Sequence, residues 1–342
     1  MEPGKELDTA KMYRVAADKF ILNITFAWEH AVAITDNNDA GKLVSHRFPQ
    51  FSFNPKLKPH FFKYLMLDKK FREHLELSSP GGAGRNRVLK ISDMLKYEIK
   101  LPSIEEQIKI GEYFDSLDHL ITLHQRKCEQ TKKLKKYMLQ KMFPQNGAKV
   151  PEIRFDGFTY DWEQRKLIDY LEVSSEKNRD NRFTKEDVLS VSGEYGIVNQ
   201  IEFQGRSFAG ASVSNYGVVE NGDVVYTKSP LKSNPYGIIK TNKGIPGIVS
   251  TLYAVYKPKE ITDSKFVQIY FELDSRMNSY MHPLVNKGAK NDMKVSAENA
   301  LKGMVSFPKK DEQEMISLYF STLDNLITLH QRQHKLHLNM LL

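Results

Sequence analysis

The apolar residues of the chain follow a heptad spacing along one extended segment. They recur at alternating intervals of four and three residues, which is typical of a coiled-coil seam. The positions of this seam are Ile110, Phe114, Leu117, Ile121, His124, Cys128, Thr131, Lys135, Met138 and Met142. The spacing predicts a helix over residues 104–143, with a length of about 60 Å at about 1.5 Å per residue. Pro144 is expected to end the helix, and His124, Thr131 and Lys135 interrupt the apolar character of its seam.

A different pattern fills the region that follows. β-Branched and aromatic runs bounded by Gly, Pro and Asn predict strands over residues 222–228, 236–241 and 247–258. Residues 264–281 return to helical spacing and predict one helix. A mixed globular part is therefore expected, with strands first, then a helix, then a loop around Gly288.

The chain repeats itself. Residues 113–126, YFDSLDHLITLHQR, match residues 319–332, YFSTLDNLITLHQR, at eleven of fourteen positions with an offset of 206. Upstream, GRNRVLKIS at residues 84–92 aligns with GAKNDMKVS at residues 288–296, at an offset of 204. The repeat predicts two copies of one plan, each a globular part followed by a helix. Because a helix with an apolar stripe needs a partner in water, we expect the two helices to pack on each other.

Composition and charge narrow the class of protein. The length of 342 residues suits two domains. An apolar run of 18 residues and a signal-peptide pattern are both missing from the sequence, so we expect a cytoplasmic protein that does not enter a membrane. Cys128 is the only cysteine, which excludes an intrachain disulfide, and its place on the seam predicts simple packing. The net charge of +8 favours a polyanionic partner.

Three motifs together resemble one family. LPSIEEQIKIGEYFDSLDHLITLHQRK, QKMFP and FDGFTYDWEQRKL, in this order, look like the specificity subunit of Type I restriction-modification systems, and the resemblance covers essentially the whole chain. It implies an α+β fold, in which two mixed α/β target recognition domains alternate with two long antiparallel coiled-coil spacer helices. The implied division is a first recognition domain at residues 1–102, a spacer helix and linker at 103–150, a second recognition domain at 151–308 and a second spacer helix at 309–342.

The resemblance also implies a role without catalysis. Each recognition domain would read one half of a bipartite double-stranded DNA target. Two modification subunits would methylate adenine with S-adenosylmethionine, and restriction subunits, which use ATP, would join this core. The chain itself is expected to hold no cofactor and no metal; His330, His334 and His337 are expected on a helix surface rather than as ligands. The sequence contains neither the Asn/Asp-Pro-Pro-aromatic motif of an adenine methyltransferase nor a phosphate-binding Gly-x-x-x-x-Gly-Lys-Ser/Thr loop.

The sequence departs from the family pattern at both ends. Trp162 opens the second copy, but at the repeat offset its counterpart would fall about 43 residues before Met1. The first recognition domain is therefore expected to be incomplete. Leu342 corresponds to Lys136, so the second helix is expected to stop about one and a half to two turns short of the end of its twin near Pro144. A natural fragment, a shifted start codon and a silent cassette for domain exchange are the open interpretations.

Candidate DNA contacts are cations, amides and hydroxyls on segments rich in Gly or Pro. Such side chains read base edges, whereas phosphates require only positive charge. The predicted contact residues are Arg85, Asn86, Arg87, Lys177, Arg179, Arg182, Lys228, Ser229, Lys232, Asn234, Lys287, Lys290, Asn291 and Lys294. The lysine run at residues 127–141 is expected either to follow phosphates or to dock the modification subunits.

Two other classes of protein fit less well. A methyltransferase or restriction enzyme with a fused recognition half would need a catalytic domain on the same chain, for which the sequence offers no motif. A coiled-coil scaffold would show one long heptad array, whereas each predicted helix here follows a globular part and ends after about 40 residues. A donor cassette that never assembles with partners stays open as an alternative within the family.

Overall fold

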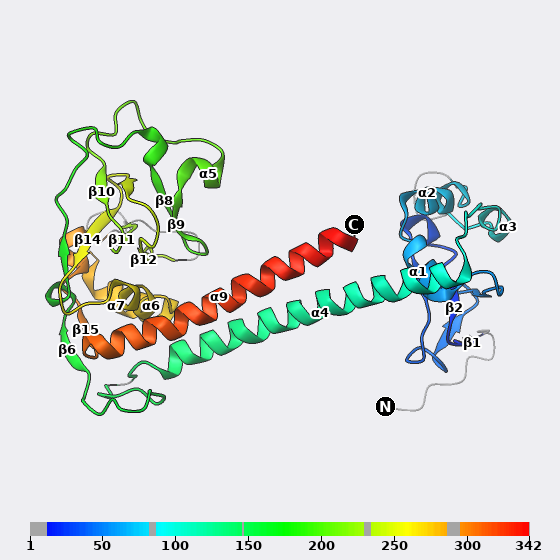
Figure 1. Ribbon diagram of the computed structural model, residues 1–342, viewed down its shortest axis with the longest axis horizontal. Helices are drawn as coiled ribbons and strands as arrows, with labels where there is room; N and C mark the ends of the chain where they lie inside the picture. The colour runs from blue at the N-terminus through cyan, green and yellow to red at the C-terminus, as the bar shows by residue number, and fades with distance from the viewer. Residues whose placement is uncertain (1–11, 82–86, 146, 229–233, 286–294, 342) are drawn as a thin grey trace. The chain divides into compact units, whose positions relative to one another are not determined.

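The computed structural model describes residues 12–81, 87–145, 147–228, 234–285 and 295–341. The chain forms two compact units. Unit 1 comprises Met1–Gln125 and Arg332–Leu342, and unit 2 comprises Arg126–Gln331. Two long helices, α4 (Ile104–Lys141) and α9 (Lys310–Leu341), each contribute residues to both units (Figure 1).

Unit 1 is built on small antiparallel sheets covered by short helices. The three-stranded sheet has the order β3-β2-β5, and a second sheet pairs β1 with β4. The strands are β1 (Met12–Arg14), β2 (Lys19–Leu22), β3 (Val32–Ile34), β4 (Leu43–Ser45) and β5 (Gln50–Ser52). The helices are α1 (Pro59–Leu65), α2 (Lys69–Leu77) and α3 (Ile91–Met94), with a 3-10 turn at Ala27–Glu29.

The core of unit 1 follows from the alternation along β2. Phe20 and Leu22 are buried while their neighbours on the strand are half-exposed, as a period of two requires. The ring of Phe20 lies edge-on to Phe62 of α1 at 5.2 Å, and Phe62 lies edge-on to Phe71 of α2 at 5.6 Å. These aromatic contacts fix α1 and α2 on one face of the sheet.

Unit 2 is larger and centres on a four-stranded antiparallel sheet of order β12-β11-β14-β7. Its strands are β7 (Leu171–Val173), β11 (Val224–Tyr226), β12 (Ile239–Thr241) and β14 (Ala254–Pro258). Further strand pairs are β6 (Glu163–Lys166) with β15 (Met304–Phe307), β8 (Leu189–Ser192) with β9 (Gly196–Asn199), and β10 (Gly217–Val219) with β13 (Gly247–Val249). The strands predicted from the sequence are thus present, since β11 and β12 lie within the first two runs and the third contains β13 and β14.

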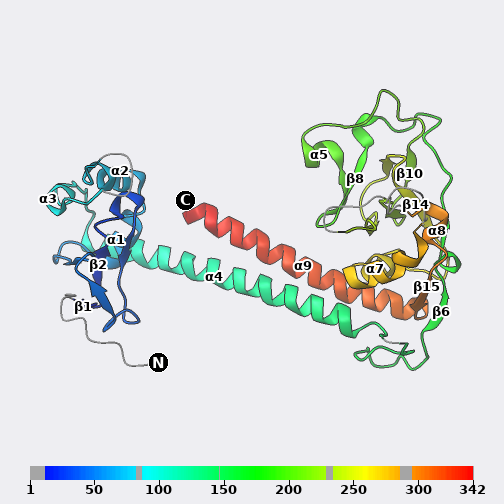
Figure 2. The same cartoon turned by 180° about the vertical axis from the view of Figure 1, so that it is seen from behind.

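The single helix expected over residues 264–281 is two helices. α6 (Ser264–Tyr270) is followed by its C-cap residue Phe271, and α7 (Asp274–Met281) begins three residues after Phe271. The break lets the buried Phe271 ring lie edge-on to Tyr280 of α7, with centroids 4.8 Å apart. The remaining helices of unit 2 are short: α5 (Gln200–Gln204), α8 (Ala297–Ala300) and 3-10 turns at Leu167–Asp169, Lys185–Asp187 and His282–Leu284. α6 and α7 lie beside the first turns of α9 in both views (Figures 1 and 2).

The two long helices have the bounds that the heptad pattern predicts, to within two residues. Within unit 2 they run antiparallel, because Lys135 contacts Asp324 while Phe143, just beyond α4, contacts Phe320 at 6.3 Å. Cys128 is buried on the seam, as expected. Among the described residues, no helix is both long and apolar enough to span a bilayer.

Candidate nucleic-acid interface

Each long helix is fastened to its globular part by a buried glutamine near its first turn. In unit 1 the side-chain oxygen of Gln107 accepts from the Lys58 amide at 3.0 Å, and its nitrogen donates to the carbonyls of Lys56 and Pro102. In unit 2 the side chain of Gln313 accepts from the Asp263 amide at 2.9 Å.

The Gln313 nitrogen also donates to the carbonyls of Ile261 and Pro308, so the pattern of unit 1 is repeated. Gln107 and Gln313 are 1% and 0% exposed. The sequence repeat is thus a repeat of contacts, and both globular parts are held on their helices in the same way.

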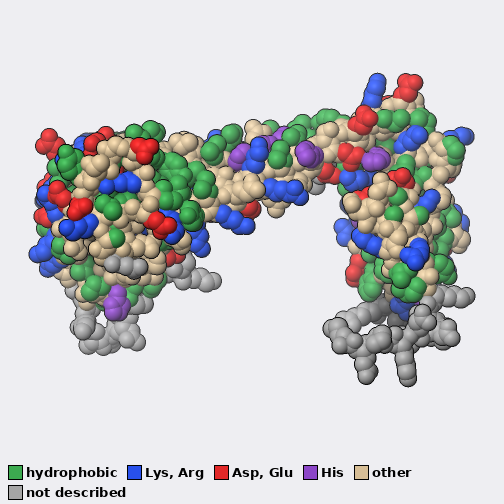
Figure 3. All heavy atoms as spheres, turned by 90° about the horizontal axis from the view of Figure 1, so that it is seen from below, with side chains coloured by type: hydrophobic (Ala, Val, Ile, Leu, Met, Phe, Trp, Pro, Cys, Tyr) green, Lys and Arg blue, Asp and Glu red, His purple; other side chains and the backbone are tan. Residues whose placement is uncertain are grey.

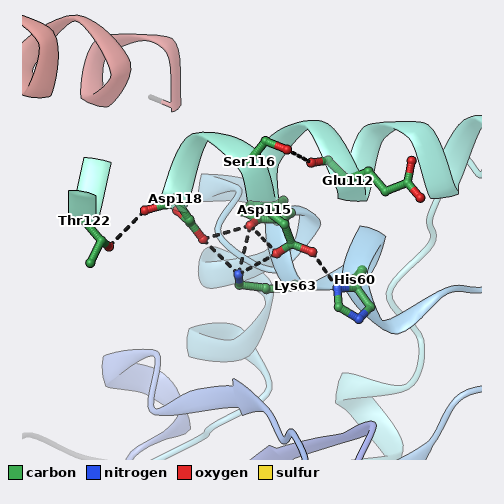
Figure 4. A network of polar contacts seen from close by, with 8 residues as sticks. His60, Lys63, Glu112, Asp115, Ser116, Asp118 and Thr122 are labelled. Carbon is green, nitrogen blue, oxygen red and sulfur yellow. Dashed lines mark hydrogen bonds and ion pairs between the residues drawn. The ribbon is translucent and has the colours of Figure 1, made fainter. Parts of the chain in front are cut away.

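A polar network adds to this attachment in unit 1 (Figure 4). Lys63 of α1 donates to Asp115 at 3.0 Å and to Asp118 at 2.8 Å, both on α4, and the hydroxyl of Tyr64 reaches the same two carboxylates. His60 adds a contact with Asp115 at 2.6 Å. Burial raises the pKa of the Asp115 carboxyl, but the hydrogen bonds from Lys63, Tyr64 and His60 outweigh it and leave the pKa below its ordinary value.

The close approach of α1 to α4 depends on a glycine. A Cβ atom on Gly111 would lie 3.0 Å from the Cβ of His60 and 3.3 Å from the backbone of α1. Gly111 therefore permits the helices to pack closely enough for the polar network to form.

In unit 2, two of the predicted contact segments come together. Lys177 pairs through its backbone with Gly217, and Lys228 follows β11 with a φ of 56°, which is uncommon outside glycine. Burial and the nearby positive charge of Lys177 lower the pKa of Lys228, whose ammonium donates to the Thr251 carbonyl at 2.9 Å. Two lysines 51 positions apart in sequence thus share one region, a favourable place for an anion.

Arg179 and Arg182 lie on the loop that follows Lys177, and the buried side chain of Asn178 holds this loop in place. Asn178 is fully buried, and its amide exchanges hydrogen bonds with both backbone groups of Phe183, at 2.9 and 2.8 Å. This holds the loop that carries Arg179 and Arg182. Arg179 is exposed. Arg182 pairs with Glu220 at 2.7 Å and lies over the Phe183 ring, so part of its charge is already neutralised.

Other predicted contact residues are engaged within the protein. Arg87 pairs with Glu76 at 3.2 Å and lies over the Trp28 ring. The Asn234 side chain donates to Asp274 of α7 at 2.7 Å. The predicted contacts that lie outside the described residues are Arg85, Asn86, Ser229, Lys232, Lys287, Lys290, Asn291 and Lys294.

One member of the lysine run is not a surface cation. Lys135 of α4 pairs with Glu272 at 2.5 Å and with Asp324 of α9 at 2.6 Å, and its side chain is 12% exposed. Burial lowers the pKa of Lys135, but the two carboxylates outweigh burial and raise it. The lysine that weakened the apolar seam therefore joins α4 to α9 by ion pairs. It is not available to a phosphate or to a partner subunit, the two roles that were expected of the lysine run at residues 127–141. Lys133 and Lys136 are exposed.

Residues 5–133 match the sequence model of a family described as the Type I restriction modification DNA specificity domain. The chain therefore resembles the specificity subunits of Type I restriction-modification systems, as its motifs predict. The S subunit of such a system from M. genitalium has a similar fold, with a TM-score of 0.58 and 14% identity over 97% of this chain and 82% of that one. The HsdS subunit from Thermoanaerobacter tengcongensis aligns with 17% identity over 96% and 80% of the two chains and a TM-score of 0.47. No curated protein matches the chain in sequence.

In this specificity-subunit fold, a cluster of exposed aromatic residues was not expected from the sequence. Tyr195 and Phe203 are 62% and 45% exposed with rings 5.4 Å apart. Beyond α5, Arg206 lies over the exposed ring of Phe208. Aromatic and arginine side chains can stack on bases or widen a base step. The interleaving of Phe203, Arg206 and Phe208 in the sequence is the signal that could have indicated this cluster.

Basic side chains are not gathered in one patch on the face seen in Figure 3. Lys and Arg alternate there with Asp and Glu over both units, and Lys, Arg and His side chains follow the helices. Without a single basic patch on this face, local groupings such as Lys177 with Lys228 matter more for binding an anion than the total net charge of +8.

Proposed function

We propose that this chain is the DNA specificity subunit of a Type I restriction-modification complex. In this proposal two target recognition domains alternate with two antiparallel spacer helices, and each domain reads one half of a bipartite target. The observation that carries it is the repeated fastening by Gln107 and Gln313, since it gives two globular parts the same attachment to two long helices. Duplicated readers on a helical spacer suit two half-sites separated by unread base pairs.

The chemistry of the proposal is DNA binding without catalysis. Lys177, Arg179 and Lys228 supply positive charge from neighbouring loops of unit 2, and Lys290 and Asn291 remain predicted base contacts. Two modification subunits would bring S-adenosylmethionine and methylate adenine, and restriction subunits would bring ATP hydrolysis and cleavage. The exposed lysines of α4 would follow phosphates or contact these partners.

The deciding experiment is target mapping with the assembled complex. The chain is coexpressed with the modification subunits of its own system, and the purified complex methylates a random DNA library in the presence of S-adenosylmethionine. We expect methylated adenines within two short sequence blocks at a fixed separation. A matched variant, Arg179→Ala with Lys177→Ala and Lys228→Ala, is expected to weaken methylation while the complex still assembles. Methylation without sequence preference, or within one undivided block, would contradict the proposal.

Two controls separate the remaining alternatives. The isolated chain incubated with S-adenosylmethionine and DNA is expected neither to methylate nor to cleave; adenine methylation by this chain alone would make it an enzyme. Failure of the folded chain to copurify with modification subunits would instead favour a donor cassette that does not assemble.

A further inference from the structure

The first turns of α9 are covered by the segment that links the two copies. Glu312 is 2% exposed, and both of its oxygens accept from Arg154 at 2.8 Å, which is a bidentate ion pair. One turn further Ile316 is 2% exposed, and Tyr319 lies against Phe155 with ring centroids 5.8 Å apart. Arg154 and Phe155 thus cover the face of α9 that Glu312, Ile316 and Tyr319 form.

The same face exists on α4. Glu106, Ile110 and Tyr113 occupy the equivalent positions at the repeat offset of 206, with spacings of four and three that place them on one side of the helix. We call these three residues the Glu106 face. Its chemistry is unchanged from that of α9: a carboxylate, an isoleucine and a tyrosine.

The Glu106 face is uncovered in the described part of unit 1. Glu106 is exposed, Ile110 is half-buried and Tyr113 is 51% exposed. Among the residues that the structure describes, none donates a hydrogen bond or an ion pair to the Glu106 carboxylate, whereas its twin in unit 2 is fully paired. Residues 1–11, MEPGKELDTAK, contain neither arginine nor an aromatic residue.

We propose that the Glu106 face binds a polypeptide segment that carries an arginine followed by an aromatic residue, as the segment with Arg154 and Phe155 does for α9. The arginine would pair with Glu106 and the ring would pack on Tyr113. Charge complementarity and the repeat support this occupant, because the face has kept the residues that recognise such a segment. The inference concerns protein binding and does not depend on the DNA-binding function.

The probe is a fluorescent synthetic peptide with the sequence of residues 149–162, KVPEIRFDGFTYDW, added to the 342-residue chain. The corresponding segment of the chain already occupies α9, which leaves the Glu106 face free. We expect saturable binding by fluorescence anisotropy. Glu106→Gln is expected to weaken it about tenfold or more, which corresponds to about 1.4 kcal/mol. Arg154→Ala in the peptide is expected to weaken it similarly.

The matched control is Glu105→Gln, which removes the same charge from the neighbouring exposed position on a different side of α4. This variant is expected to bind the peptide as the wild type does. Absence of binding, or equal loss in Glu105→Gln and Glu106→Gln, would overturn the proposal. The proposal would also be overturned if Glu312→Gln abolished binding while Glu106→Gln left it intact. The peptide would then be displacing residues 149–162 of the chain from α9. Self-association of the chain that the peptide does not displace would assign the face to a second copy, and would also overturn it.

Discussion

Gln313 makes in unit 2 the same three backbone hydrogen bonds that Gln107 makes in unit 1. Each side chain joins the loop before its helix to the segment that enters a helix of the globular part, α1 or α6. The two residues are 206 positions apart and both are buried. A glutamine in the first turn of a helix would otherwise be expected in solvent.

Gln313→Ala is expected to destabilise unit 2 by about 1–3 kcal/mol, because it leaves one amide and two carbonyls without their buried partner. The quantity to measure is the free energy of unfolding in urea. Gln130→Ala, at an exposed position of α4, is the control and is expected to change this free energy by less than about 0.5 kcal/mol. A Gln313→Ala chain as stable as the control would show that the fastening is dispensable.

Lys135→Ala is expected to lower stability by about 2 kcal/mol, because it leaves the Glu272 and Asp324 carboxylates close together without their cation. In DNA binding by the assembled complex, the salt dependence of this variant is expected to match that of the wild type. If Lys133 and Lys136 contact phosphates, Lys133→Ala and Lys136→Ala should cost little stability. Each should reduce the salt slope, which is the slope of the logarithm of the binding constant against the logarithm of the salt concentration, by about 0.9 per contact. A reduced salt slope for Lys135→Ala at unchanged stability would refute the buried role.

The stability of unit 1 is expected to fall in acid through Asp115. The folded-state pKa of its carboxyl is below the ordinary value, so the unfolded state binds the proton more strongly. Its contribution is complete above about pH 5 and is lost as pH falls through about 4 and then through the lowered folded pKa. Trp28 fluorescence in a Trp162→Phe background would follow unit 1. Asp115→Asn should show a smaller decrease between about pH 5 and 3 than its parent does. Equal decreases would assign the acid sensitivity to other groups.

Arg179→Ala is expected to weaken DNA binding by the assembled complex more than Arg182→Ala does. Arg179 is exposed, whereas Arg182 is already paired with Glu220. If Arg179 contacts a phosphate, its loss lowers affinity evenly across DNA sequences and reduces the salt slope by about 0.9. A change in sequence preference at one position would instead make Arg179 a base contact, and an effect limited to Arg182→Ala would contradict the ranking.

The long helices and the main strands could be predicted because they depend on local periodicity. The heptad spacing gave both bounds of α4 to within two residues, and the repeat did the same for α9. The break between α6 and α7 could not be read from the sequence, since residues 264–281 keep helical spacing through it. The break accompanies the packing of Phe271 on Tyr280, nine positions away, which is a tertiary contact.

The intramolecular partners of the predicted contact residues could not be predicted from the sequence either. Lys135 was recognised as a poor seam residue, but its two carboxylates come from α9 and from the segment between α6 and α7, more than 130 positions away. Arg87 and Asn234 lie in segments with the composition of DNA-reading loops. The side chain of Arg87 nevertheless forms an ion pair with Glu76, and that of Asn234 donates a hydrogen bond to Asp274. Which cation is free and which is paired depends on tertiary contacts that composition does not encode.

Gly111 has a consequence for how the chain avoids assembling incorrectly as it folds. Because α4 and α9 share most of one stretch of sequence, α1 could in principle dock on either helix. The residue of α9 equivalent to Gly111 is Ser317, and a Cβ at the Gly111 position lies only 3.0 Å from the Cβ of His60, so a serine there would force α1 to shift. Asp115 is likewise replaced by Ser321, so Lys63 would lose a carboxylate. These two differences between near-identical helices favour docking of α1 on α4 over docking on α9 as the chain folds.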